Sequence, residues 1–296
     1  MRIVVLYGGN SAERAVSLVS GARVTTALRA RGHTVGAFDW NEEPLAEMLL
    51  DAMHGCDAVF LALHGGAGEN GALQAMLERE GIAHYIGSAP SGATLAMQKH
   101  LARECVRAFG IPVARGGLWM PGEPPPVCAP LVCKPPDGGS SVGLCFVNTP
   151  AELEKFTPSV PLLCEEYLTG REYTVGILEG EALPVVEIRP IAGAYDYAHK
   201  YTVGACEELC PAPIDAAATA HLQALACKAF AALGLRDFAR IDFRENAVGE
   251  PHFLEANTLP GMTETSLLPL AAATAGIPFP MLCERMCMCA AKRKKN

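Results

Sequence analysis

Apolar residues recur along this chain with two periods, and short apolar runs alternate with helical stripes from the first residues onward. The run Ile3 to Tyr7 ends in a glycine turn, Gly8-Gly9-Asn10, a pattern typical of a buried strand. A helix is predicted from there to Gly32, with one stripe formed by Ala15, Leu18, Val19, Ala22 and Thr26. Further strands are predicted over 35–40 and 58–63. Together these units predict a parallel α/β lobe over residues 1–90.

The rest of the chain mixes strands and helices. We predict strands over 131–135, 162–168, 171–179 and 182–189, and helices over 91–110, 214–233, 266–275 and near the end. Ser91 is the predicted cap of the first of these helices, and Thr149-Pro150-Ala151-Glu152 is a capping box that opens a short one. Since 296 residues exceed the usual size of a single core, two or three lobes are expected.

The segment from Arg240 to Ser266 carries the densest candidate chemistry. Residues 237–244 alternate, with Arg240 and Asp242 on the more polar face, and 253–257 predict a returning strand with Glu255 and Asn257 on one side. If the strands pair, the oxygens of Asp242, Glu255 and Asn257 converge. Such oxygens suit Mg²⁺, which keeps coordination positions for substrate phosphates. The structural alternative is the solvated face of an ordinary hairpin.

Two glycine-rich loops are further candidates. The loop 64–71 begins with His64, and its glycines allow a close approach of the backbone to a ligand. It is not a P-loop, because no Gly-Lys-Ser/Thr follows, and His64 is equally consistent with a loop histidine bonded to nearby backbone. The loop 137–143 follows Lys134 in a predicted hairpin, which can cover phosphates while the lysine supplies charge. The alternative there is a flexible hairpin.

Two other features have both a structural and a functional interpretation. Glu13, three residues after Asn10, fits a variant capping box, but it also lies at a strand–helix junction, where open α/β sheets bind ligands. The long segment 191–210 is rich in glycine, tyrosine and charge, and Lys200 lies near its middle. A loop of this length in a compact enzyme is more often a lid than a spacer, although an ordered surface loop is the alternative.

Composition and charge restrict the classes of function. Half of the residues are hydrophobic and 19% are charged, which is typical of a globular protein. The net charge of −8 argues against general nucleic-acid binding, but a local cluster of cations can still hold a phosphate ligand. We see no secretory signal and no apolar run of membrane-spanning length, so we expect a cytoplasmic protein that does not enter a membrane.

The 12 cysteines are expected to be reduced and mostly buried, because a cytoplasmic compartment keeps thiols reduced. Cys283, Cys287 and Cys289 lack the paired spacing of a zinc site, so packing on a helix is their expected role. The basic tail over 292–295 is expected to be solvated next to a helix C-terminus.

Taken in order, these motifs resemble the D-alanine–D-alanine ligases of the ATP-grasp superfamily over almost the whole chain. The matching segments are 8–13, 64–71, Lys99, 134–143, 165–172, 195–201 and 240–266. A single motif is a weak signal, whereas seven in order are highly specific. The resemblance implies a three-lobed α/β and α+β architecture, with the nucleotide held between the central and C-terminal lobes. The lobes are expected at 1–90 (N-terminal α/β, substrate), 91–168 (central, with the phosphate-covering loop) and 169–296 (C-terminal, with the lid and the metal site).

The resemblance also implies roles for matching residues around ATP. The expected ATP-binding residues are Lys99, Lys134, Ser140, Glu165, Glu166, Tyr167, Leu168, Glu172 and Lys200. Lys99 and Lys134 would contact the α- and β-phosphates under the Ser140–Ser141 loop, and Lys200 would reach the γ-phosphate. The adenine would stack near Tyr167 and bond the backbone at 166 and 168, while Glu172 would take the ribose.

At the other end of the site the resemblance implies two D-alanines and two Mg²⁺ ions, with Mn²⁺ possible. The expected metal ligands are Asp242, Glu255 and Asn257. Glu13 would fix the ammonium of the first D-alanine with His64 nearby, and Ser266 and Leu267 would seat the second. Arg240 and the Gly261 N–H would bind the developing oxyanion. Ser141 and Tyr201 would link the lid to Glu13 and complete the catalytic set Glu13, Ser141, Tyr201, Arg240 and Gly261.

The implied reaction is ATP-dependent. The first carboxylate attacks the γ-phosphate and gives an acyl phosphate, and the second amine then attacks that carbonyl and releases phosphate. The product, D-alanyl-D-alanine, is a peptidoglycan precursor, and the resemblance implies a homodimer. Because water would hydrolyse the acyl phosphate, the mechanism needs a closing lid.

The chain departs from the family pattern at Asn70, Gln98, Arg103 and Leu259, none of which is an expected metal ligand or catalytic lysine. Alternatives are a D-alanine–D-lactate or D-alanine–D-serine ligase, another ATP-grasp carboxylate–amine ligase, or a non-catalytic nucleotide-binding regulator. Tyr201 after Lys200 favours the dipeptide product, and Glu13 in its setting argues against other ligases. The complete set around Arg240 and Asp242 argues against a regulator.

Overall fold

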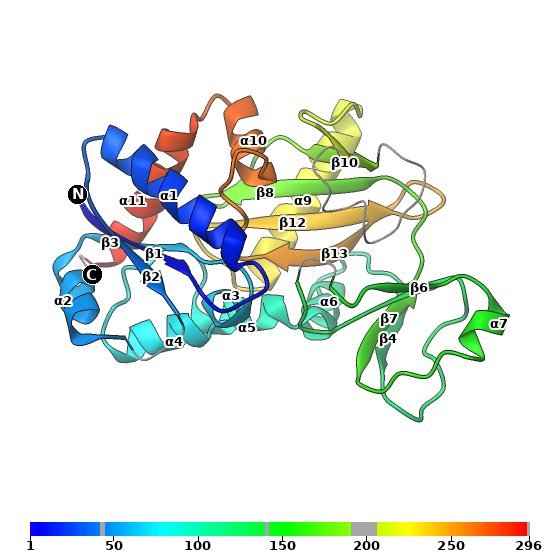
Figure 1. The fold of residues 1–296 in the computed structure, drawn as a ribbon. Coiled ribbons are helices and arrows are strands. Elements are labelled where there is room, and N and C mark those ends of the chain that lie inside the picture. Colours follow the sequence, from blue (N-terminus) through cyan, green and yellow to red (C-terminus); the bar gives the residue numbers. More distant parts are fainter. Residues whose placement is uncertain (42–44, 140–141, 191–205, 295–296) are drawn as a thin grey trace.

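The computed structural model describes residues 1–41, 45–139, 142–190 and 206–294, which form three sheets with helices around them (Figure 1). The first sheet is parallel in the order β2-β1-β3, as predicted for the first lobe. Its strands are β1 (Arg2–Gly8), β2 (Thr34–Trp40) and β3 (Ala58–Ala62). Its helices are α1 (Arg14–Ala30), α2 (Glu47–Gly55), α3 (Gly66–Glu69) and α4 (Ala72–Arg79).

Helix α1 buries a different face from the predicted stripe. Ala15, Leu18, Val19, Ala22 and Thr26 are all exposed, whereas Ser17, Ser20, Gly21, Val24, Thr25, Ala27 and Leu28 are buried. The small residues let α1 lie close to β1, since a Cβ on Gly21 would fall 2.5 Å from the Cβ of Tyr7. Burial leaves the Ser17 hydroxyl fully hydrogen-bonded, because it accepts from the Gly8 N–H and donates to the Ala62 carbonyl. The hydrophobic pattern therefore gave the wrong face, because hydrogen-bonded serines occupy core positions.

The second sheet is antiparallel in the order β4-β7-β5-β6. Its strands are β4 (Gly116–Trp119), β5 (Leu131–Lys134), β6 (Cys145–Val147) and β7 (Leu162–Glu166). The short helix α7 (Pro150–Leu153) begins as the capping box predicts, since the Thr149 Oγ1 accepts from the Glu152 N–H at 3.2 Å.

The predicted helix over 91–110 is two helices, α5 (Pro90–Met97) and α6 (Lys99–Ala108). Gln98 interrupts them with a ψ of 85°, and the Lys99 N–H donates to the Pro136 carbonyl at 2.7 Å. The prediction of Ser91 as the cap is wrong: Ala89 is the N-cap and Pro90, whose φ is preset for a helix, takes the first position. As a result Lys99 begins a new helix next to the hairpin of β5 and β6.

The third sheet has the order β11-β10-β8-β12-β13, with β9 paired to β8. Its strands are β8 (Glu172–Leu178), β9 (Glu181–Ala182), β10 (Val186–Pro190), β11 (Cys206–Leu209), β12 (Phe238–Glu245) and β13 (Pro251–Asn257). The strand predicted over 182–189 is therefore split after Ala182, where the Leu183 N–H bonds the Gly176 carbonyl.

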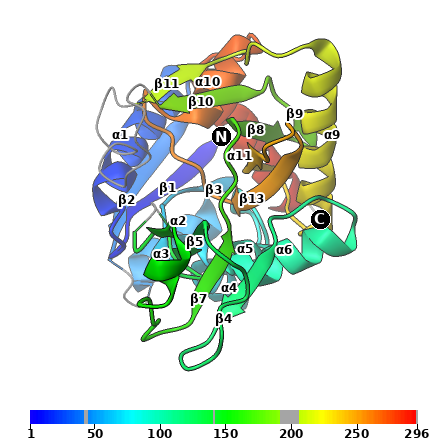
Figure 2. The same cartoon turned by 90° about the vertical axis from the view of Figure 1, so that its right-hand side faces the viewer.

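Helix α9 (Ala216–Ala232) lies against one face of this third sheet (Figure 2). Together with α6 it packs on the apolar side of β12, which carries Ala239, Ile241 and Phe243. The same alternation puts Arg240 and Asp242 on the opposite side of the strand. The sheet thus separates a hydrophobic core from a polar face.

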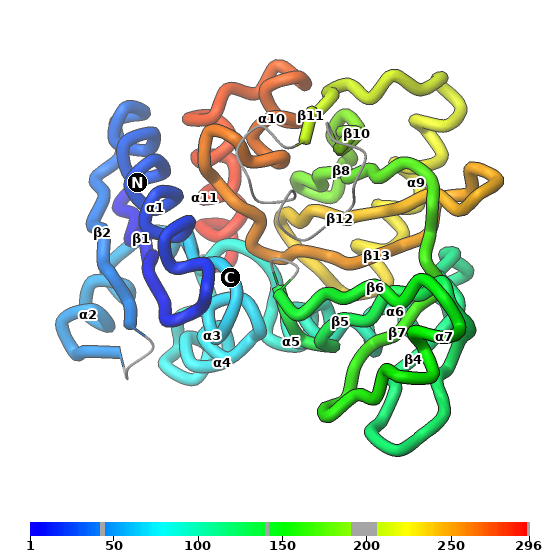
Figure 3. Tube along the Cα trace, turned by 45° about the vertical axis from the view of Figure 1, so that its right-hand side comes forward, coloured from blue at the N-terminus to red at the C-terminus, as the bar shows by residue number. Residues whose placement is uncertain are grey.

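The last two helices, α10 (Leu267–Thr274) and α11 (Phe279–Lys294), return toward the first lobe (Figure 3). Leu282, Cys283 and Met286 of α11 belong to the same core as β1 and β3. In the described part of the chain no single helix is both long and apolar enough to cross a membrane. Helices α10 and α11 taken together reach that length and apolar composition, but the pair is bent by 103°. The lobe boundaries given above remain a prediction.

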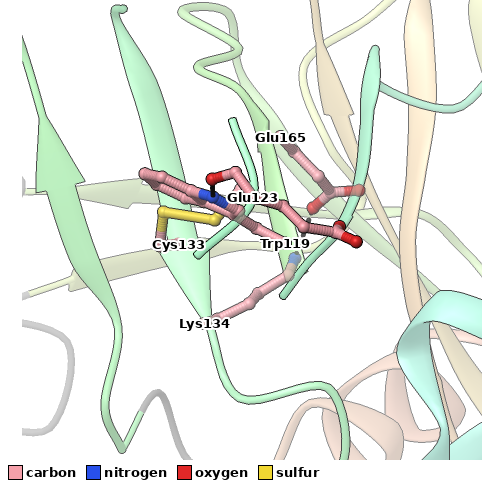
Figure 4. The surroundings of a disulfide bond; sticks show 6 residues. Trp119, Glu123, Cys133, Lys134 and Glu165 are labelled. Carbon is pink, nitrogen blue, oxygen red and sulfur yellow. Dashed lines mark hydrogen bonds and ion pairs between the residues drawn. A yellow bond between two sulfur atoms is a disulfide. The ribbon is translucent and has the colours of Figure 1, made fainter. Parts of the chain in front are cut away.

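Cys133 of β5 and Cys164 of β7 form a disulfide, so the expectation that all cysteines are reduced is wrong (Figure 4). The two residues are directly opposite on neighbouring strands, 4.3 Å apart between Cα atoms. Their separation of 31 positions in the chain concealed this pairing. The expectation that most cysteines are buried also fails: of the free ones, Cys56, Cys283 and Cys287 are buried, Cys128 is exposed, and the others are partly buried.

Candidate active site

Residues of the second and third sheets, together with segments that follow strands of the first sheet, line a cavity of about 830 Å³. Most of the predicted site residues lie on its wall: Glu13, His64, Lys99, Lys134, Glu165, Glu166, Tyr167, Leu168, Glu172, Arg240, Asp242, Glu255, Asn257, Gly261 and Leu267. These positions are spread over more than 250 residues of sequence, and folding brings them together. Ser140, Ser141, Lys200 and Tyr201 lie outside the described residues.

Strands β12 and β13 pair as expected and bring the predicted metal ligands together. Asp242 is opposite Glu255 and Arg240 is opposite Asn257, with a bulge just after Asp242. The Asn257 Nδ2 donates to the Asp242 Oδ2 at 3.1 Å, and the Thr174 Oγ1 donates to the other carboxylate oxygen at 2.6 Å. The hairpin therefore gathers two carboxylates and one amide on the wall of the cavity.

Arg240 and Asp242 form a bidentate ion pair along the same face of β12. The Arg240 Nε and Nη2 donate to the two carboxylate oxygens at 3.0 and 2.9 Å. Burial alone would lower the pKa of Arg240, but the Asp242 carboxylate, with Glu255 and Glu69 further away, raises it above its ordinary value. The guanidinium is thus a permanent cation in this part of the cavity.

Lys99 supplies a second cation at the start of α6. Its Nζ lies 3.1 Å from the Glu255 Oε2 and also donates to the Gly138 carbonyl. Burial would lower the pKa of Lys99, but the Glu255 carboxylate outweighs that effect and raises it. A charged lysine therefore lies between the predicted metal ligands and the glycine-rich loop after β5.

The third cation, Lys134, points from β5 toward β7. Its Nζ lies 2.8 Å from the Glu165 Oε2, and the buried Arg103 approaches the other oxygen of Glu165 with its Nε at 3.5 Å. Figure 4 shows Lys134 and Glu165 next to the disulfide, each one residue from a bridged cysteine. The strand alternation sends the cysteines into the core and these charged groups into the cavity.

The segment after β7 lines the same end of the cavity. The Glu166 carboxylate turns toward Arg115, accepting from its N–H at 2.9 Å and its Nε at 2.7 Å. Burial would raise the pKa of Glu166, but the backbone and side-chain bonds from Arg115 lower it overall. The Tyr167 ring meets Phe146 edge-on at 5.6 Å between centroids, and Leu168 is buried. The Glu172 Oε2 lies 3.5 Å from the Arg244 Nη1.

At the opposite end Glu13 precedes α1 as its N-cap residue, but its side chain makes no capping bond. The capping-box interpretation is therefore wrong, and the Asn10 side chain instead bonds the Asn41 carbonyl. The Glu13 carboxylate lies near Gly65, where a Cβ would fall 2.6 Å from its Oε2. Gly65 has a φ of 64°, so both its conformation and this close approach require glycine.

His64 bonds a backbone carbonyl, as the structural interpretation supposed, but both of its side-chain partners belong to segments distant in sequence. Its Nδ1 lies 2.9 Å from the Leu259 carbonyl and its Nε2 lies 2.9 Å from the Ser20 Oγ. Burial lowers the pKa of His64 despite the bond to Leu259. Leu267 lines the cavity at the start of α10, and Ser266, its N-cap, lies behind Gly261, where a Cβ would fall 2.7 Å from the Ser266 Oγ.

The sequence interpretation missed four buried polar residues. Glu69, Ser20 and Thr174 hydrogen-bond the predicted site residues or the loops that carry them, and Arg103 forms an ion pair with Glu165. Arg103 was noticed only as a departure from a family lysine, although it is one helical turn after Lys99. The other departures are structural: Asn70 accepts from the Ala72 N–H at the start of α4, Gln98 separates α5 from α6, and Leu259 is buried.

Comparison with known proteins gives one consistent result. The family model described as "D-ala D-ala ligase C-terminus" matches residues 126–288. A D-alanine–D-alanine ligase of Oleidesulfovibrio alaskensis is 44% identical, over 97% of this chain and 95% of the relative, and one of Synechococcus sp. (strain JA-3-3Ab) is 40% identical, over 99% and 94%. The crystal structure of the Bacillus anthracis ligase complexed with ATP has a TM-score of 0.83 at 30% identity, covering 100% of this chain and 98% of that one.

Proposed function

The chain belongs to the D-alanine–D-alanine ligase family, and from this premise we propose how its cavity joins two D-alanines at the expense of ATP. It is an ATP-dependent carboxylate–amine ligase whose product, D-alanyl-D-alanine, serves peptidoglycan precursor synthesis. One observation carries the assignment of its site: Lys99, Lys134 and Arg240 share a single cavity with Asp242, Glu255 and Asn257. Cations for a triphosphate and oxygen ligands for its metals are what phosphoryl transfer requires.

The adenosine part of ATP binds between the segment after β7 and the third sheet. The backbone at Glu166 and Leu168 bonds the adenine next to the Tyr167 ring, Glu165 accepts from the adenine amine, and Glu172 takes the ribose. In support of this assignment, five residues line one end of the cavity: Glu165, Glu166, Tyr167, Leu168 and Glu172. Lys99 and Lys134 bind the α- and β-phosphates: the Lys99 ammonium bonds Gly138 of the β5–β6 loop, and Lys134, which ends β5, lines the same cavity as that loop.

The donor set near Lys99 fits magnesium. Asp242 and Glu255 supply hard anionic oxygens from opposite strands, and the Asn257 amide donates its N–H to Asp242, which leaves its oxygen as an acceptor. Two Mg²⁺ ions, or Mn²⁺, held there would neutralise charge on the β- and γ-phosphates. The chain's own part is to hold these oxygens next to the phosphate-binding Lys99.

The amino-acid substrates occupy the end formed by the first lobe and the loop after β13. Glu13 pairs with the ammonium of the first D-alanine. This contact directs the carboxylate of that D-alanine at the γ-phosphate of ATP, where the acyl phosphate forms. The second D-alanine lies against Ser266 and Leu267, and its amine attacks the acyl carbonyl. Arg240 and the Gly261 N–H stabilise the negative oxygen that develops, since fixed donors gain most where charge appears in the transition state.

The remaining assignments rest on the family alone. Ser140, Ser141, Lys200 and Tyr201 are proposed to close over the phosphates and exclude water from the acyl phosphate. A homodimer and a cytoplasmic location belong to the same proposal, as do the lobe boundaries at 90 and 168.

A coupled assay tests the proposal directly. Purified protein with Mg-ATP should release phosphate only when D-alanine is added, and mass spectrometry should find D-alanyl-D-alanine. L-alanine is the matched negative control, and an equimolar D-alanine and D-lactate mixture tests the second substrate. Phosphate release that does not depend on D-alanine would overturn the proposal, and a dominant depsipeptide would replace the second substrate with D-lactate.

A further inference from the structure

The backbone of residues 258–262, which we call the oxyanion loop because it carries Gly261, is held by side chains of the first lobe. Two of them come from α1. The Ser20 Oγ accepts from the Met262 N–H at 3.2 Å, and one turn later the Arg23 Nη1 donates to the Met262 carbonyl at 3.1 Å. The N–H and the carbonyl of Met262 are therefore both bonded to side chains on one face of α1.

His64 extends this contact to Leu259, and its tautomer follows from its partners. The Leu259 carbonyl can only accept, so the His64 Nδ1 carries the proton. In the neutral ring Nε2 then accepts, and Ser20 must donate its hydroxyl proton to it at 2.9 Å. The result is one directed chain, from the Met262 N–H to Ser20, from Ser20 to His64, and from His64 to Leu259.

Glu69 holds the beginning of the oxyanion loop. Its Oε1 accepts from the Thr258 and Leu259 N–H groups, both at 3.1 Å, while its Oε2 accepts from the Gly65 N–H at 3.0 Å. Ser20 and His64, which bond the end and the middle of the loop, are buried as well. Backbone groups on both sides of Gly261 are thus fixed from the first lobe.

Gly261 itself lines the cavity, and its N–H donates to no residue in the described part of the chain. Leu259, two residues before it, and Met262, directly after it, are both bonded to the first lobe, and these bonds restrict the direction of the Gly261 N–H. We propose that Ser20 is a positioning residue for the ligation step, acting through His64 and Met262 to aim the Gly261 N–H at the developing oxyanion. The inference rests on the proposed function, which assigns that role to Gly261.

The chain offers a matched control on the same helix. Ser17 is also buried and also makes two hydrogen bonds, but both its partners, Gly8 and Ala62, belong to the first sheet. Ser17→Ala and Ser20→Ala therefore remove the same hydroxyl with comparable loss of stability, and only Ser20→Ala releases the oxyanion loop. A third variant, Arg23→Met, frees the Met262 carbonyl from a partly exposed position, and it also removes the guanidinium that lies over the Phe279 ring at 3.9 Å.

The readout separates the two chemical steps. Scrambling of ¹⁸O from the β,γ-bridge of labelled ATP reports acyl phosphate formation, and dipeptide formation reports the second step. In Ser20→Ala we expect dipeptide formation to fall about 10- to 100-fold, the size of effect that a displacement of about 1 Å produces, with scrambling and the KM for ATP within about twofold of wild type. Ser17→Ala should keep both rates per folded molecule.

Each outcome decides the proposal. If Ser20→Ala retains wild-type dipeptide formation, or loses both steps equally, Ser20 is merely structural. If Ser20→Ala does not fold, Arg23→Met is tested by the same comparison. We expect Arg23→Met to lower dipeptide formation selectively, but by less than Ser20→Ala. Equal losses of dipeptide formation and ¹⁸O scrambling in Arg23→Met would overturn the proposal. Wild-type protein that makes no dipeptide would refute the proposed function instead, so the two failures are distinguishable.

Discussion

Glu255 lies directly opposite Asp242 on the β12–β13 hairpin, and its Oε2 is 3.1 Å from the Lys99 Nζ. One carboxylate therefore adjoins both a predicted metal ligand and a predicted phosphate-binding cation. Its charge serves two purposes: it raises the pKa of Lys99 against the effect of burial, and it offers an anionic ligand to Mg²⁺.

The first prediction concerns this carboxylate. Glu255→Gln keeps the shape of the side chain but removes its charge, so D-alanine-dependent phosphate release should fall by at least about 100-fold at ordinary Mg²⁺ concentrations. The fold should persist, because the apolar side of β12 is untouched. Phosphate release, measured over a Mg²⁺ titration, checks the expectation.

A matched variant exists in the same hairpin. Glu250 lies in the exposed turn, where its carboxylate accepts from Asn246, so Glu250→Gln should leave activity unchanged. If Glu255→Gln released phosphate at the wild-type rate at every Mg²⁺ concentration, Glu255 would not be a metal ligand.

The second prediction concerns Glu13, whose carboxylate lines the cavity without capping α1. Loss of a charge-assisted hydrogen bond costs about 1.5–3 kcal/mol, so Glu13→Gln should raise the KM for the first D-alanine by roughly 10- to 100-fold. The KM for ATP should stay within about twofold. A change confined to the ATP affinity would instead put Glu13 near the nucleotide.

Much of the site could be predicted because its motifs are local. The alternation of residues 237–244 fixed which side of β12 carries Arg240 and Asp242, and strand pairing then brought Glu255 and Asn257 next to them. The register could not be predicted, because the bulge after Asp242 is set by packing and not by the sequence pattern. Glycine-rich loops pointed to the neighbourhood of Glu69 and Gly65 but not to their partners.

The missed residues share a different property, which is that they bond across long stretches of chain. Ser20 and Met262 are separated by 242 positions, and Glu69 and Thr258 by 189. A serine on a helix looks like a solvated residue until its distant partner is known, and this is why the exposed and buried faces of α1 were exchanged. Such contacts depend on how lobes meet, which hydrophobic periodicity does not encode.

The third prediction concerns the disulfide between Cys133 and Cys164. A bridge closing a loop of this length typically stabilises a protein by about 2–4 kcal/mol, so a reductant should lower the unfolding temperature. Cys133→Ser should be less stable and insensitive to reductant, whereas Cys128→Ser, which changes an exposed free thiol, should behave as wild type. Equal unfolding temperatures with and without reductant would mean that the pair is reduced in solution.

The last prediction is a pH dependence of stability that arises from His64. Burial lowers the pKa of His64 below its ordinary value of 6.5, whereas the unfolded chain keeps that ordinary value. Between these two values the unfolded state binds more protons than the folded one. The contribution of His64 is therefore complete above about pH 6.5 and is lost progressively as the pH falls from there toward the folded-state pKa. Burial lowers the pKa of His84 as well, so its contribution has the same sign.

Urea unfolding of wild type, His64→Gln and His84→Gln between pH 5 and pH 8 checks this expectation. Each substitution replaces a titrating ring by a neutral amide, so each variant should lose less stability than wild type on going from pH 7 to pH 5, and the double variant less still. The exposed His221 provides the comparison, since His221→Gln should keep the wild-type slope. Burial raises the pKa of the Glu69 carboxyl, so the total slope includes a carboxylate, and the difference between His64→Gln and wild type is what reports His64. If His64→Gln lost as much stability as wild type over this interval, His64 would be charged in the folded protein, and the directed chain from Met262 through Ser20 to Leu259 could not carry the proton positions assigned to it.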